Sequence, residues 1–149
     1  MRIILLFATA MLVGAEPAEQ PRTAAEVIAL DKQWSQAEDE GDVAWLEALL
    51  SPDYQSIAVD GSAIDRDHIL ATARRNATLD PAQRRDMAAK NAAWLAQHAG
   101  TMRVVLSGDT AVLTFVSKMP GKTGLIMSSD VFAWHDGRWH ALYSQHSNA

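Results

Sequence analysis

The sequence predicts an α+β domain in which helices come first and an antiparallel sheet follows. Three observations support this. Apolar residues recur at helical spacing as far as residue 99, and from Met102 onward they alternate with a period of two. Near the end of the chain, Asp136-Gly137 lies between alternating apolar residues, a strong hairpin signal because type I′ turns need positive φ at both central positions. The length of 149 residues fits one domain.

Two helices are expected at the start of this domain. Thr23-Ala24-Ala25-Glu26 is a capping box, and the helix that it opens runs to about Glu40 and ends at Gly41. Asp42 caps a second, short helix, and Pro52 follows its end. The apolar stripe of the first helix consists of Val27, Leu30, Trp34 and Ala37, and that of the second consists of Trp45, Leu46, Leu49 and Leu50.

The middle of the chain predicts one strand and two more helices. The strand covers Tyr54 to Val59 and turns at Asp60-Gly61. A third helix is capped by Asp65 and runs to about Asn76. Asp80-Pro81 opens a fourth helix that ends at Gly100, because proline at the first helical position loses no hydrogen bond.

The remaining residues predict the sheet. Two strands, Met102 to Leu106 and Ala111 to Phe115, flank a turn at Gly108-Asp109. Leu125 to His135 and Arg138 to Ser147 form the final hairpin. We found no internal repeat and no linker that would divide the domain.

The hairpin turn fixes a predicted register. With a two-residue loop, His135 pairs with Arg138. The following pairs, moving away from the turn, are then Trp134 with Trp139, Phe132 with Ala141, Asp130 with Tyr143, and Ser128 with Gln145. These eight side chains share one face of the sheet, which is aromatic near the turn and polar farther away. Covered by helices, such a face predicts a small-molecule pocket.

The first residues predict export. Met1-Arg2 is a charged start, Ile3 to Val13 is apolar, and small residues precede a cleavage point near Ala15. The apolar run is too short to span a bilayer, so we expect no stable membrane insertion after cleavage. The expected protein is secreted or periplasmic. An uncleaved N-terminal anchor is the alternative. The predicted division is a signal peptide at 1–15, a flexible leader at 16–22 and a single domain at 23–149, with a helical insert at 80–99.

Charge and composition exclude several classes of function. Removal of residues 1–15 leaves 12 basic and 18 acidic residues and a net charge of −6, which is unsuited to nucleic-acid binding. The chain has no cysteine, so it forms no disulfide and offers no thiolate ligand. No glycine-rich phosphate loop, dinucleotide motif or nucleophile elbow is present. We therefore expect no cofactor.

The five histidines do not form a metal-binding set in the sequence. The predicted register places His135, His140 and His146 on the sheet face opposite the tryptophan pair. His68 and His98 belong to separate predicted helices, and no pair has the i, i+4 spacing of a helical zinc site. We expect no metal, and a contribution of His140 and His146 to a dimer interface.

The residues also resemble a known group of proteins. The matching segments, in chain order, are Leu30-Asp31-Lys32-Gln33-Trp34, Gly41-Asp42 with Leu46 and Leu49-Leu50, Asp53-Tyr54, Asp60-Gly61, Gly108-Asp109-Thr110-Ala111-Val112, Asp130-Val131-Phe132 and Asp136-Gly137-Arg138-Trp139. This set resembles the nuclear transport factor 2-like (NTF2-like) superfamily, in its SnoaL-like and ketosteroid-isomerase-like branch, and most closely the group called domain of unknown function 4440.

The resemblance implies a cone-shaped fold, with helices closing a curved, mostly antiparallel sheet around a cavity, and frequent homodimerisation through the outer sheet face. The helix at 80–99 departs from the pattern, since only a short connection is expected before the third strand. The superfamily includes isomerases, cyclases, dehydratases and non-enzymatic binders, so resemblance alone does not define a function.

Asp130 and Tyr143 are the candidate catalytic residues. Directly opposed side chains of an antiparallel pair have Cβ atoms about 4.5–5.5 Å apart. A desolvated carboxyl suits a general acid or base, and an adjacent phenol could stabilise an oxyanion. The alternative is a buried pair that only satisfies its own hydrogen bonds. Ligand-binding candidates are Trp34 and Tyr54, as an aromatic wall or ordinary core, and Ser128 and Gln145, as orienting groups or as residues at a solvated sheet end.

Three functions remain open from the sequence. The first is an exported domain that binds a small molecule in a partly apolar cavity. The second is a cofactor-independent isomerase, dehydratase or cyclase acting on a small carbonyl compound, with Asp130 moving the proton and Tyr143 polarising the carbonyl. The third is an accessory domain that associates with itself or with another exported protein through Val131, Leu142 and the outer sheet. Whether the protein is an enzyme is left undecided at this stage.

Overall fold

A computed structural model describes residues 21–118 and 124–149. The predicted signal peptide and nearly all of the predicted leader lie outside these residues. The described elements, in chain order, are α1 (Ala24–Glu40), α2 (Val43–Leu49), β1 (Leu50–Ile57), β2 (Ala63–Asp65), α3 (Arg66–Ala77), α4 (Pro81–His98), the 3-10 helix η1 (Ala99–Thr101), β3 (Arg103–Ser107), β4 (Thr110–Ser117), β5 (Ile126–His135) and β6 (Arg138–Asn148).

The first two helices begin where the sequence predicts, and the first also ends there. The Thr23 hydroxyl accepts a hydrogen bond from the backbone N–H of Glu26 and so caps α1. Gly41 ends α1 in the left-handed conformation, with φ of 74°. Its αL geometry leaves no room for a side chain, because an added Cβ would lie 2.4 Å from the backbone nitrogen of Ala77. Asp42 then caps α2 through the N–H of Trp45.

The third and fourth helices also follow their predicted caps. Asp65 accepts from the N–H of His68 at the start of α3. Asp80 and Gln83 form a reciprocal capping box at the start of α4. This helix is the predicted insert before the third strand, and its one fully buried residue is His98. Among the described helices, none has the length and apolar character needed to cross a membrane.

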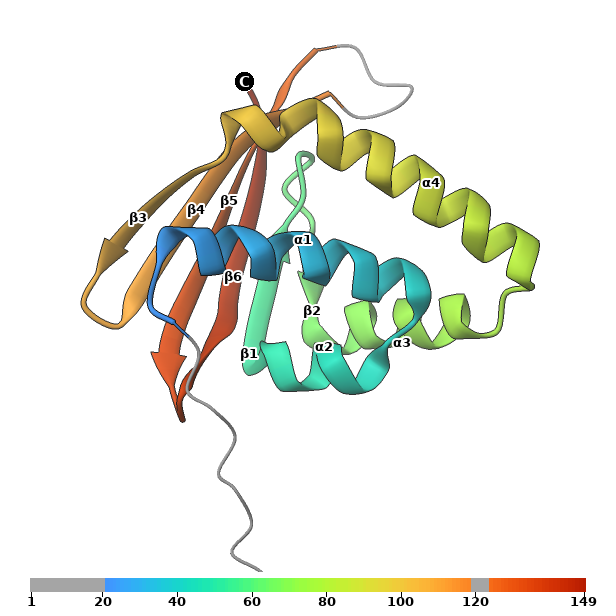
Figure 1. The fold of residues 1–149 in the computed structure, drawn as a ribbon, viewed down its shortest axis with the longest axis horizontal. Coiled ribbons are helices and arrows are strands. Elements are labelled where there is room, and N and C mark those ends of the chain that lie inside the picture. Colours follow the sequence, from blue (N-terminus) through green and yellow to red (C-terminus); the bar gives the residue numbers. More distant parts are fainter. Residues whose placement is uncertain (1–20, 119–123) are drawn as a thin grey trace, which may run out of the picture.

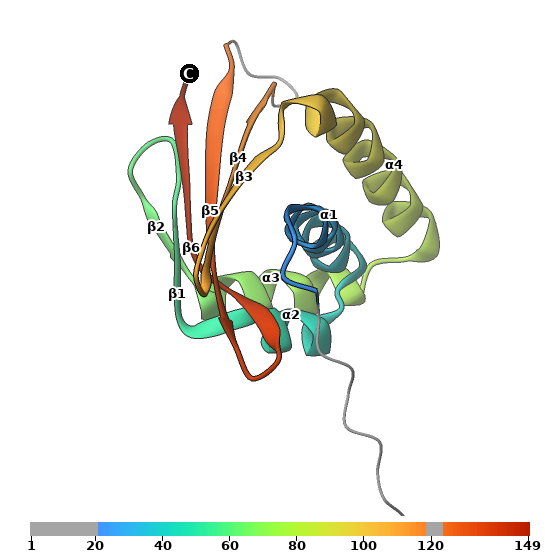
Figure 2. The same ribbon diagram turned by 60° about the vertical axis from the view of Figure 1, so that its left-hand side comes forward.

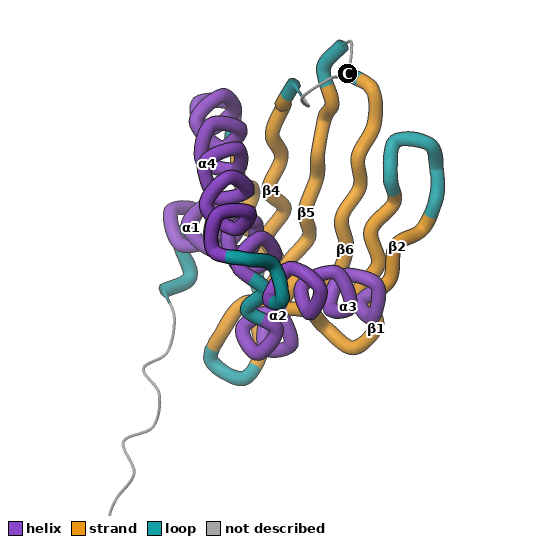
Figure 3. The backbone as a smooth tube through the Cα atoms, turned by 90° about the vertical axis from the view of Figure 1, so that its right-hand side faces the viewer, coloured by secondary structure: helices purple, strands orange, loops and turns teal. Residues whose placement is uncertain are grey.

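The six strands form one sheet with the order β2-β1-β6-β5-β4-β3 (Figure 1). All neighbouring strands are antiparallel except β1 and β6, which are parallel. Helix α1 lies across one face of the sheet, and α4 lies farther out and meets the sheet only near its C-terminal end (Figure 2). Helices α2 and α3 lie at one end of the strands (Figure 3). The result is the predicted α+β architecture, helices on a curved and mostly antiparallel sheet.

The hydrophobic core lies between α1 and the sheet. Trp34 of α1 contacts Tyr54 and Phe132 edge-on, with ring centroids 5.4 and 6.2 Å away. Trp134 and Trp139 meet edge-on at 5.2 Å next to the hairpin turn, as their predicted pairing requires. Burial of these rings in the core stabilises a chain that has no disulfides.

Strand β1 differs from its prediction. It begins at Leu50, which the sequence assigns to the second helix, and it contains Pro52. Its pairing with β6 breaks between Leu50 and Gln55, because proline has no N–H to donate to the ladder. The short strand β2, which pairs with the end of β1, was not predicted.

The hairpin register is correct near the turn and wrong beyond it. Pairing follows the prediction from His135–Arg138 as far as Phe132–Ala141. A β-bulge then intervenes, with Leu142 as the extra residue of β6. Beyond the bulge, Val131 pairs with Tyr143, and every later residue of β6 lies on the face opposite to the predicted one.

The bulge lies beside an irregular stretch of the neighbouring strand. Leu50 of β1 pairs with Ala141 on one side of the bulge, and Gln55 pairs with Tyr143 on the other. The irregular stretch of β1 that contains Pro52 therefore lies beside Leu142. Both strands lose their regular hydrogen-bond ladder at the same level of the sheet. The extra residue of β6 therefore interrupts the sheet at a level where the pairing of β1 with β6 is already irregular.

Candidate functional site

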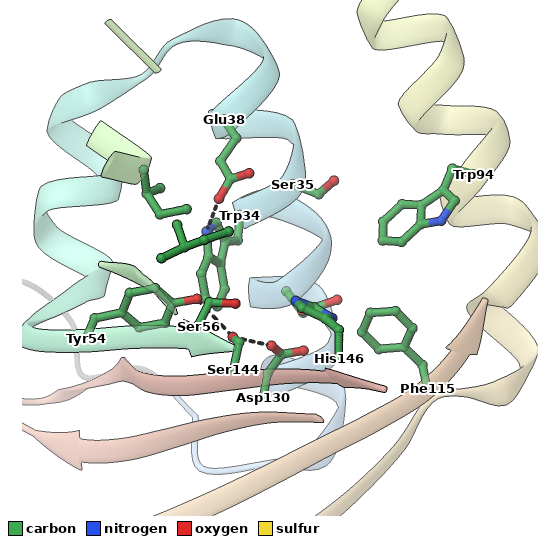
Figure 4. Close-up of a pocket in the computed structure, with 13 residues that line it drawn as sticks. Trp34, Ser35, Glu38, Tyr54, Ser56, Trp94, Phe115, Asp130, Ser144 and His146 are labelled. Carbon is green, nitrogen blue, oxygen red and sulfur yellow. Dashed lines mark hydrogen bonds between the residues drawn. The ribbon is translucent and has the colours of Figure 1, made fainter. Parts of the chain in front are cut away.

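A cavity of about 220 Å³ opens between α1, α4 and the face of the sheet that α1 covers. Its walls come from every layer of the domain (Figure 4). Asp31, Trp34, Ser35 and Glu38 belong to α1, Tyr54 and Ser56 to β1, Ile64 to β2, Ile69 to α3, Trp94 to α4, Phe115 to β4, Asp130 to β5, and Ser144 and His146 to β6. The lining combines aromatic and aliphatic walls with a set of acidic and hydroxyl groups.

A short chain of hydrogen bonds crosses the floor of the cavity. The Tyr54 hydroxyl donates to Ser144 Oγ at 2.9 Å, and Ser144 Oγ donates to Asp130 Oδ1 at 2.5 Å. Figure 4 shows this chain running along the sheet from β1 through β6 to β5. All three side chains are buried, so the Asp130 carboxyl is held in one position by a partner that is itself held.

Two further carboxyl groups come from α1, the helix that covers the sheet. Asp31 is 8 % exposed, and Glu38 accepts a hydrogen bond from Trp34 Nε1 at 2.8 Å. Asp31, Trp34 and Glu38 lie at i, i+3 and i+7, so they share the helix face that looks toward the sheet. The cavity therefore has acidic groups both in its floor and in its roof.

Burial controls the protonation of these groups. Desolvation raises the pKa of Asp31 to about 8, and repulsion from Asp130 and then Glu38 adds to the shift, while Lys32 opposes it. Desolvation likewise raises the pKa of Glu38 to about 7, against the hydrogen bond from Trp34. The pKa of Asp130 rises to about 6, because its hydrogen bond from Ser144 offsets only part of the desolvation. The carboxyls therefore exchange protons near neutral pH.

The two remaining titratable groups of the lining are neutral at pH 7. Desolvation raises the pKa of Tyr54 above its ordinary value. Burial lowers the pKa of His146, whose Nδ1 lies 2.8 Å from Ser128 Oγ. The lining at neutral pH thus contains ionisable acids, a neutral imidazole and a neutral phenol, which is a set that can accept or donate protons without a fixed positive charge.

The structure places the predicted site residues in two groups. Trp34, Tyr54 and Asp130 line the cavity as expected, and Ser128 lies buried beneath it as the hydrogen-bond partner of His146. Tyr143 and Gln145 do not face it.

The bulge at Leu142 turns Tyr143 and Gln145 to the outer face, where the Tyr143 hydroxyl is 3.4 Å from the Gln145 amide oxygen. The predicted pairs are therefore wrong: Asp130 pairs with Ser144 rather than Tyr143, and Ser128 pairs with His146 rather than Gln145. The same shift brings His146 to the inner face, contrary to the prediction for it.

Ten lining residues were missed by the sequence reasoning, and four of them carry titratable groups or belong to the hydrogen-bond chain. Ser144 and His146 depend on the bulge, for which Leu142 itself gives no signal; Pro52 in the neighbouring strand is the only hint. Asp31 and Glu38 did leave a signal, because they lie at i−3 and i+4 from Trp34 on an otherwise apolar helix face. Acidic residues on a buried stripe are rare unless they have a partner or a function.

One group of potential metal ligands exists among the described residues, away from the cavity. His135, Asp136 and His140 at the hairpin turn have ligand atoms within 4.8 Å of one another. The sequence prediction of no metal set rested on the histidine spacings and the absence of cysteine, and it did not consider Asp136. In the structure, His135 Nδ1 lies 3.0 Å from Asp136 Oδ2, and the His135 and His140 rings stack at 3.7 Å.

Comparison with solved structures defines the fold. The chain is similar to an NTF2-like protein from Cytophaga hutchinsonii, with a TM-score of 0.55 and 16 % identity over 85 % of this chain and 99 % of that one. For an NTF-2 like protein of unknown function from Silicibacter pomeroyi, the TM-score is 0.56 and the identity is 20 %, over 86 % of this chain and 100 % of that one. For an NTF2-like protein with a cystatin-like fold from Novosphingobium aromaticivorans, the TM-score is 0.52 and the identity is 19 %, over 83 % of this chain and 80 % of that one.

No protein-family model matches the sequence, and no curated protein does. The structural similarity nevertheless covers 83–86 % of this chain. The protein therefore has the NTF2-like fold, as the resemblance in the sequence implied. The fold leaves open which ligand or reaction the cavity serves.

Proposed function

We propose that this protein binds a small, partly apolar molecule in the cavity between α1, α4 and the sheet. The observation that supports this most directly is the cavity itself, in which buried carboxyls adjoin aromatic walls. Ligand sites typically combine apolar walls with a few convergent polar groups. An engineered apolar cavity of about 150 Å³ holds benzene, so a cavity of about 220 Å³ suits a compact organic ligand.

Native mass spectrometry of the protein purified from its own host tests this proposal. We expect a retained small molecule in the wild type and its loss in Ile64→Trp, which fills the cavity from β2. Val59→Trp is the matched control, because Val59 is 39 % exposed and does not line the cavity. Equal retention by both variants, or no bound molecule in any sample, contradicts the proposal.

A second function is supported by the protonation of Asp130. A carboxyl with a pKa of about 6 can accept and return a proton near neutral pH, as a cofactor-independent isomerase or dehydratase acting on a carbonyl compound requires. The polarising donor of this proposal is no longer Tyr143. Tyr54, the phenol at the cavity floor, takes its place, and its hydroxyl must turn from Ser144 to the substrate to polarise a carbonyl.

Proton exchange gives a direct assay of this second function. Small ketones incubated with the protein in D₂O should exchange their α-protons, as followed by NMR, and Asp130→Asn should abolish the exchange. Asp136→Asn is a suitable control, because Asp136 is exposed at the hairpin turn. Exchange that is the same with and without Asp130 contradicts an acid–base role.

The finer classification, the dimer and the export remain proposals. A SnoaL-like or domain of unknown function 4440 assignment is supported by the sequence segments given above. Homodimerisation through the outer sheet face is supported by exposed apolar side chains on it, with Met127 at 44 % and Leu142 at 37 % exposure. Light scattering should show a dimer that Leu142→Asp dissociates, and a monomeric wild type contradicts it. The same surface would serve the alternative accessory role.

Export is supported by the pattern of residues 1–15. Amino-terminal sequencing of the protein recovered from its host should give a chain that starts at or near Glu16. A chain that retains Met1 contradicts cleavage.

A further inference from the structure

The charged groups that line the cavity are all acidic. Asp31, Glu38 and Asp130 are the carboxyls, and neither lysine nor arginine is among the described lining residues. The one basic group of the lining is His146, which burial keeps neutral at pH 7 by lowering its pKa. Lys32 is the cation close enough to act on Asp31, and it lies on a different surface, between α1 and α2.

Among the described residues, Asp31 differs from the other two carboxyls in having no hydrogen-bond partner. Ser144 donates to Asp130, and Trp34 donates to Glu38. Asp31 is just as deeply buried, at 8 % exposure, yet within the described part of the chain its carboxyl accepts no hydrogen bond and forms no ion pair. The fold thus keeps an unpaired acceptor on the wall of a cavity.

Aromatic rings surround the same space. Trp34 and Tyr54 lie on one side of the cavity, and Trp94 and Phe115 lie on the other (Figure 4). The ring centroids of Trp94 and Phe115 are 5.9 Å apart. The electron-rich faces of such rings attract cations, and tryptophan is the strongest of them. Aromatic walls beside acidic groups are therefore complementary to a positively charged organic group.

We propose that the ligand of this cavity is an organic cation, a protonated amine on a small apolar body, whose ammonium group is bound by the unpaired carboxylate of Asp31. This inference rests on the proposed binding function and names its ligand class. A carboxylate or phosphate ligand would face three acids with no cation among the described lining residues to balance them. A neutral ligand would leave Asp31 either unpaired or protonated.

The protonation of the cavity gives the proposal a measurable signature. Asp31 is faced by Asp130 from β5 and by Glu38 and Lys32 of its own helix; Tyr54 and His146 are the other titratable groups of the lining. An arriving ammonium group favours the charged form of each carboxyl. Because burial holds the pKa of Asp31 near 8 and that of Glu38 near 7, a cation must displace protons when it binds near neutral pH.

Three probes of nearly the same shape separate the ligand classes. Benzylamine is a cation at pH 7, benzyl alcohol is neutral and benzoate is an anion. Isothermal titration of the full mature chain should show benzylamine binding at least tenfold more tightly than either of the others. Repeating the titration in two buffers with different ionisation enthalpies should show proton release with benzylamine and none with benzyl alcohol.

Two variants assign the effect to Asp31. Asp31→Asn should weaken benzylamine at least tenfold while leaving benzyl alcohol within about twofold, and it should lower the proton release. It removes an unpaired buried acid, so we expect it to fold, which circular dichroism and thermal unfolding verify. Asp86→Asn makes the same Asp-to-Asn replacement at an exposed site on α4, where Asp86 pairs with Lys90, and should alter neither titration.

Several outcomes overturn the proposal. Benzoate or benzyl alcohol binding as tightly as benzylamine excludes a cation-selective site, while leaving the proposed binding function intact. Benzylamine binding that is insensitive to Asp31→Asn removes the assigned contact. Absence of binding by all three probes also overturns the cation proposal, whereas the proposed function itself fails only if the native mass spectrometry shows no retained molecule.

Discussion

The two halves of the β5–β6 hairpin have different roles although they belong to the same two strands. The half next to the turn, from Phe132 to Ala141, keeps a regular register and carries apolar side chains into the core. The half beyond the bulge at Leu142 carries Asp130, Ser144 and His146 into the cavity. A single extra residue thus separates a packing segment from a polar segment.

The comparison shows how one sheet face can serve both stability and chemistry. Near the turn, buried apolar area stabilises the fold, and no acidic side chain is buried there. Beyond the bulge, buried acids oppose stability unless they are paired or protonated. Substitutions in the two halves should therefore differ in kind as well as in size.

The largest effect is expected in the half next to the turn. Trp139 is 1 % exposed and packs against Trp134, so Trp139→Ala leaves a large void in the core. We expect the free energy of unfolding to fall by about 3–5 kcal/mol, as measured by urea denaturation. Trp139→Phe, which keeps a ring, should cost less. A loss below about 1 kcal/mol for Trp139→Ala would contradict a packing role for this half.

The next effect is a pH dependence that comes from the cavity acids. The folded chain holds the pKa of Asp31 near 8, against 3.8 for a free carboxyl, so it keeps a proton that the unfolded chain releases near pH 4. The free energy of unfolding should therefore fall as pH rises from about 4 to 8. Asp31→Asn should flatten this slope and stabilise the protein at pH 8 by roughly 2–5 kcal/mol.

Urea denaturation at a series of pH values measures this dependence. Glu38, with a pKa of about 7, and Asp130, with a pKa of about 6, should give the remaining slope in the Asp31→Asn variant. Asp86→Asn should retain the slope of the wild type. Stability that rises with pH over the same range would show that the cavity acids are charged in the folded protein.

A smaller effect is expected at the centre of the polar half. Ser144→Ala removes both the acceptor of the Tyr54 hydroxyl and the donor to Asp130. We expect a loss of about 1–3 kcal/mol in the free energy of unfolding. The pKa of Asp130, followed by NMR, should rise further, since the Ser144 hydrogen bond lowers it. Ser147→Ala, at an exposed site of the same strand, should change neither quantity.

The smallest effect concerns Tyr143, which the bulge places on the outer face. Tyr143→Phe removes only a hydroxyl whose described partner, Gln145, is 3.4 Å away on the same face. The free energy of unfolding should change by less than about 0.5 kcal/mol, and binding of any cavity ligand should be unaffected. A loss of ligand binding in this variant would instead support the register without the bulge.

Most of the fold could be predicted because its signals are local. Thr23, Asp42, Asp65 and Asp80 each cap the helix that follows them, since a cap depends on neighbouring residues alone. The Asp136-Gly137 turn likewise fixed the first pairs of the hairpin, and both turn residues have the positive φ that it requires, 52° and 75°.

The candidate site was predicted in part. The residues placed by local sequence signals were predicted, and those placed by pairing between distant strands were not. Trp34, Tyr54 and Asp130 reach the cavity because helical spacing and the hairpin turn place them on inward faces. Ser144 and His146 could not be predicted, because their orientation depends on a bulge beside an irregular stretch of a strand about 90 residues away in sequence. Asp31 and Glu38 could have been recognised as acids on a buried helix face.

By itself, the sequence determined the order of the elements, the helix caps, the hairpin turn and the acidic character of the chain, since each follows from residues close together or from composition. Only the tertiary structure decided which side of β6 faces inward and which acids meet in one cavity. The reason is physical: strand β1 returns from far along the chain to pair with β6, and that pairing, rather than the local alternation, sets the orientation of the side chains beyond Leu142.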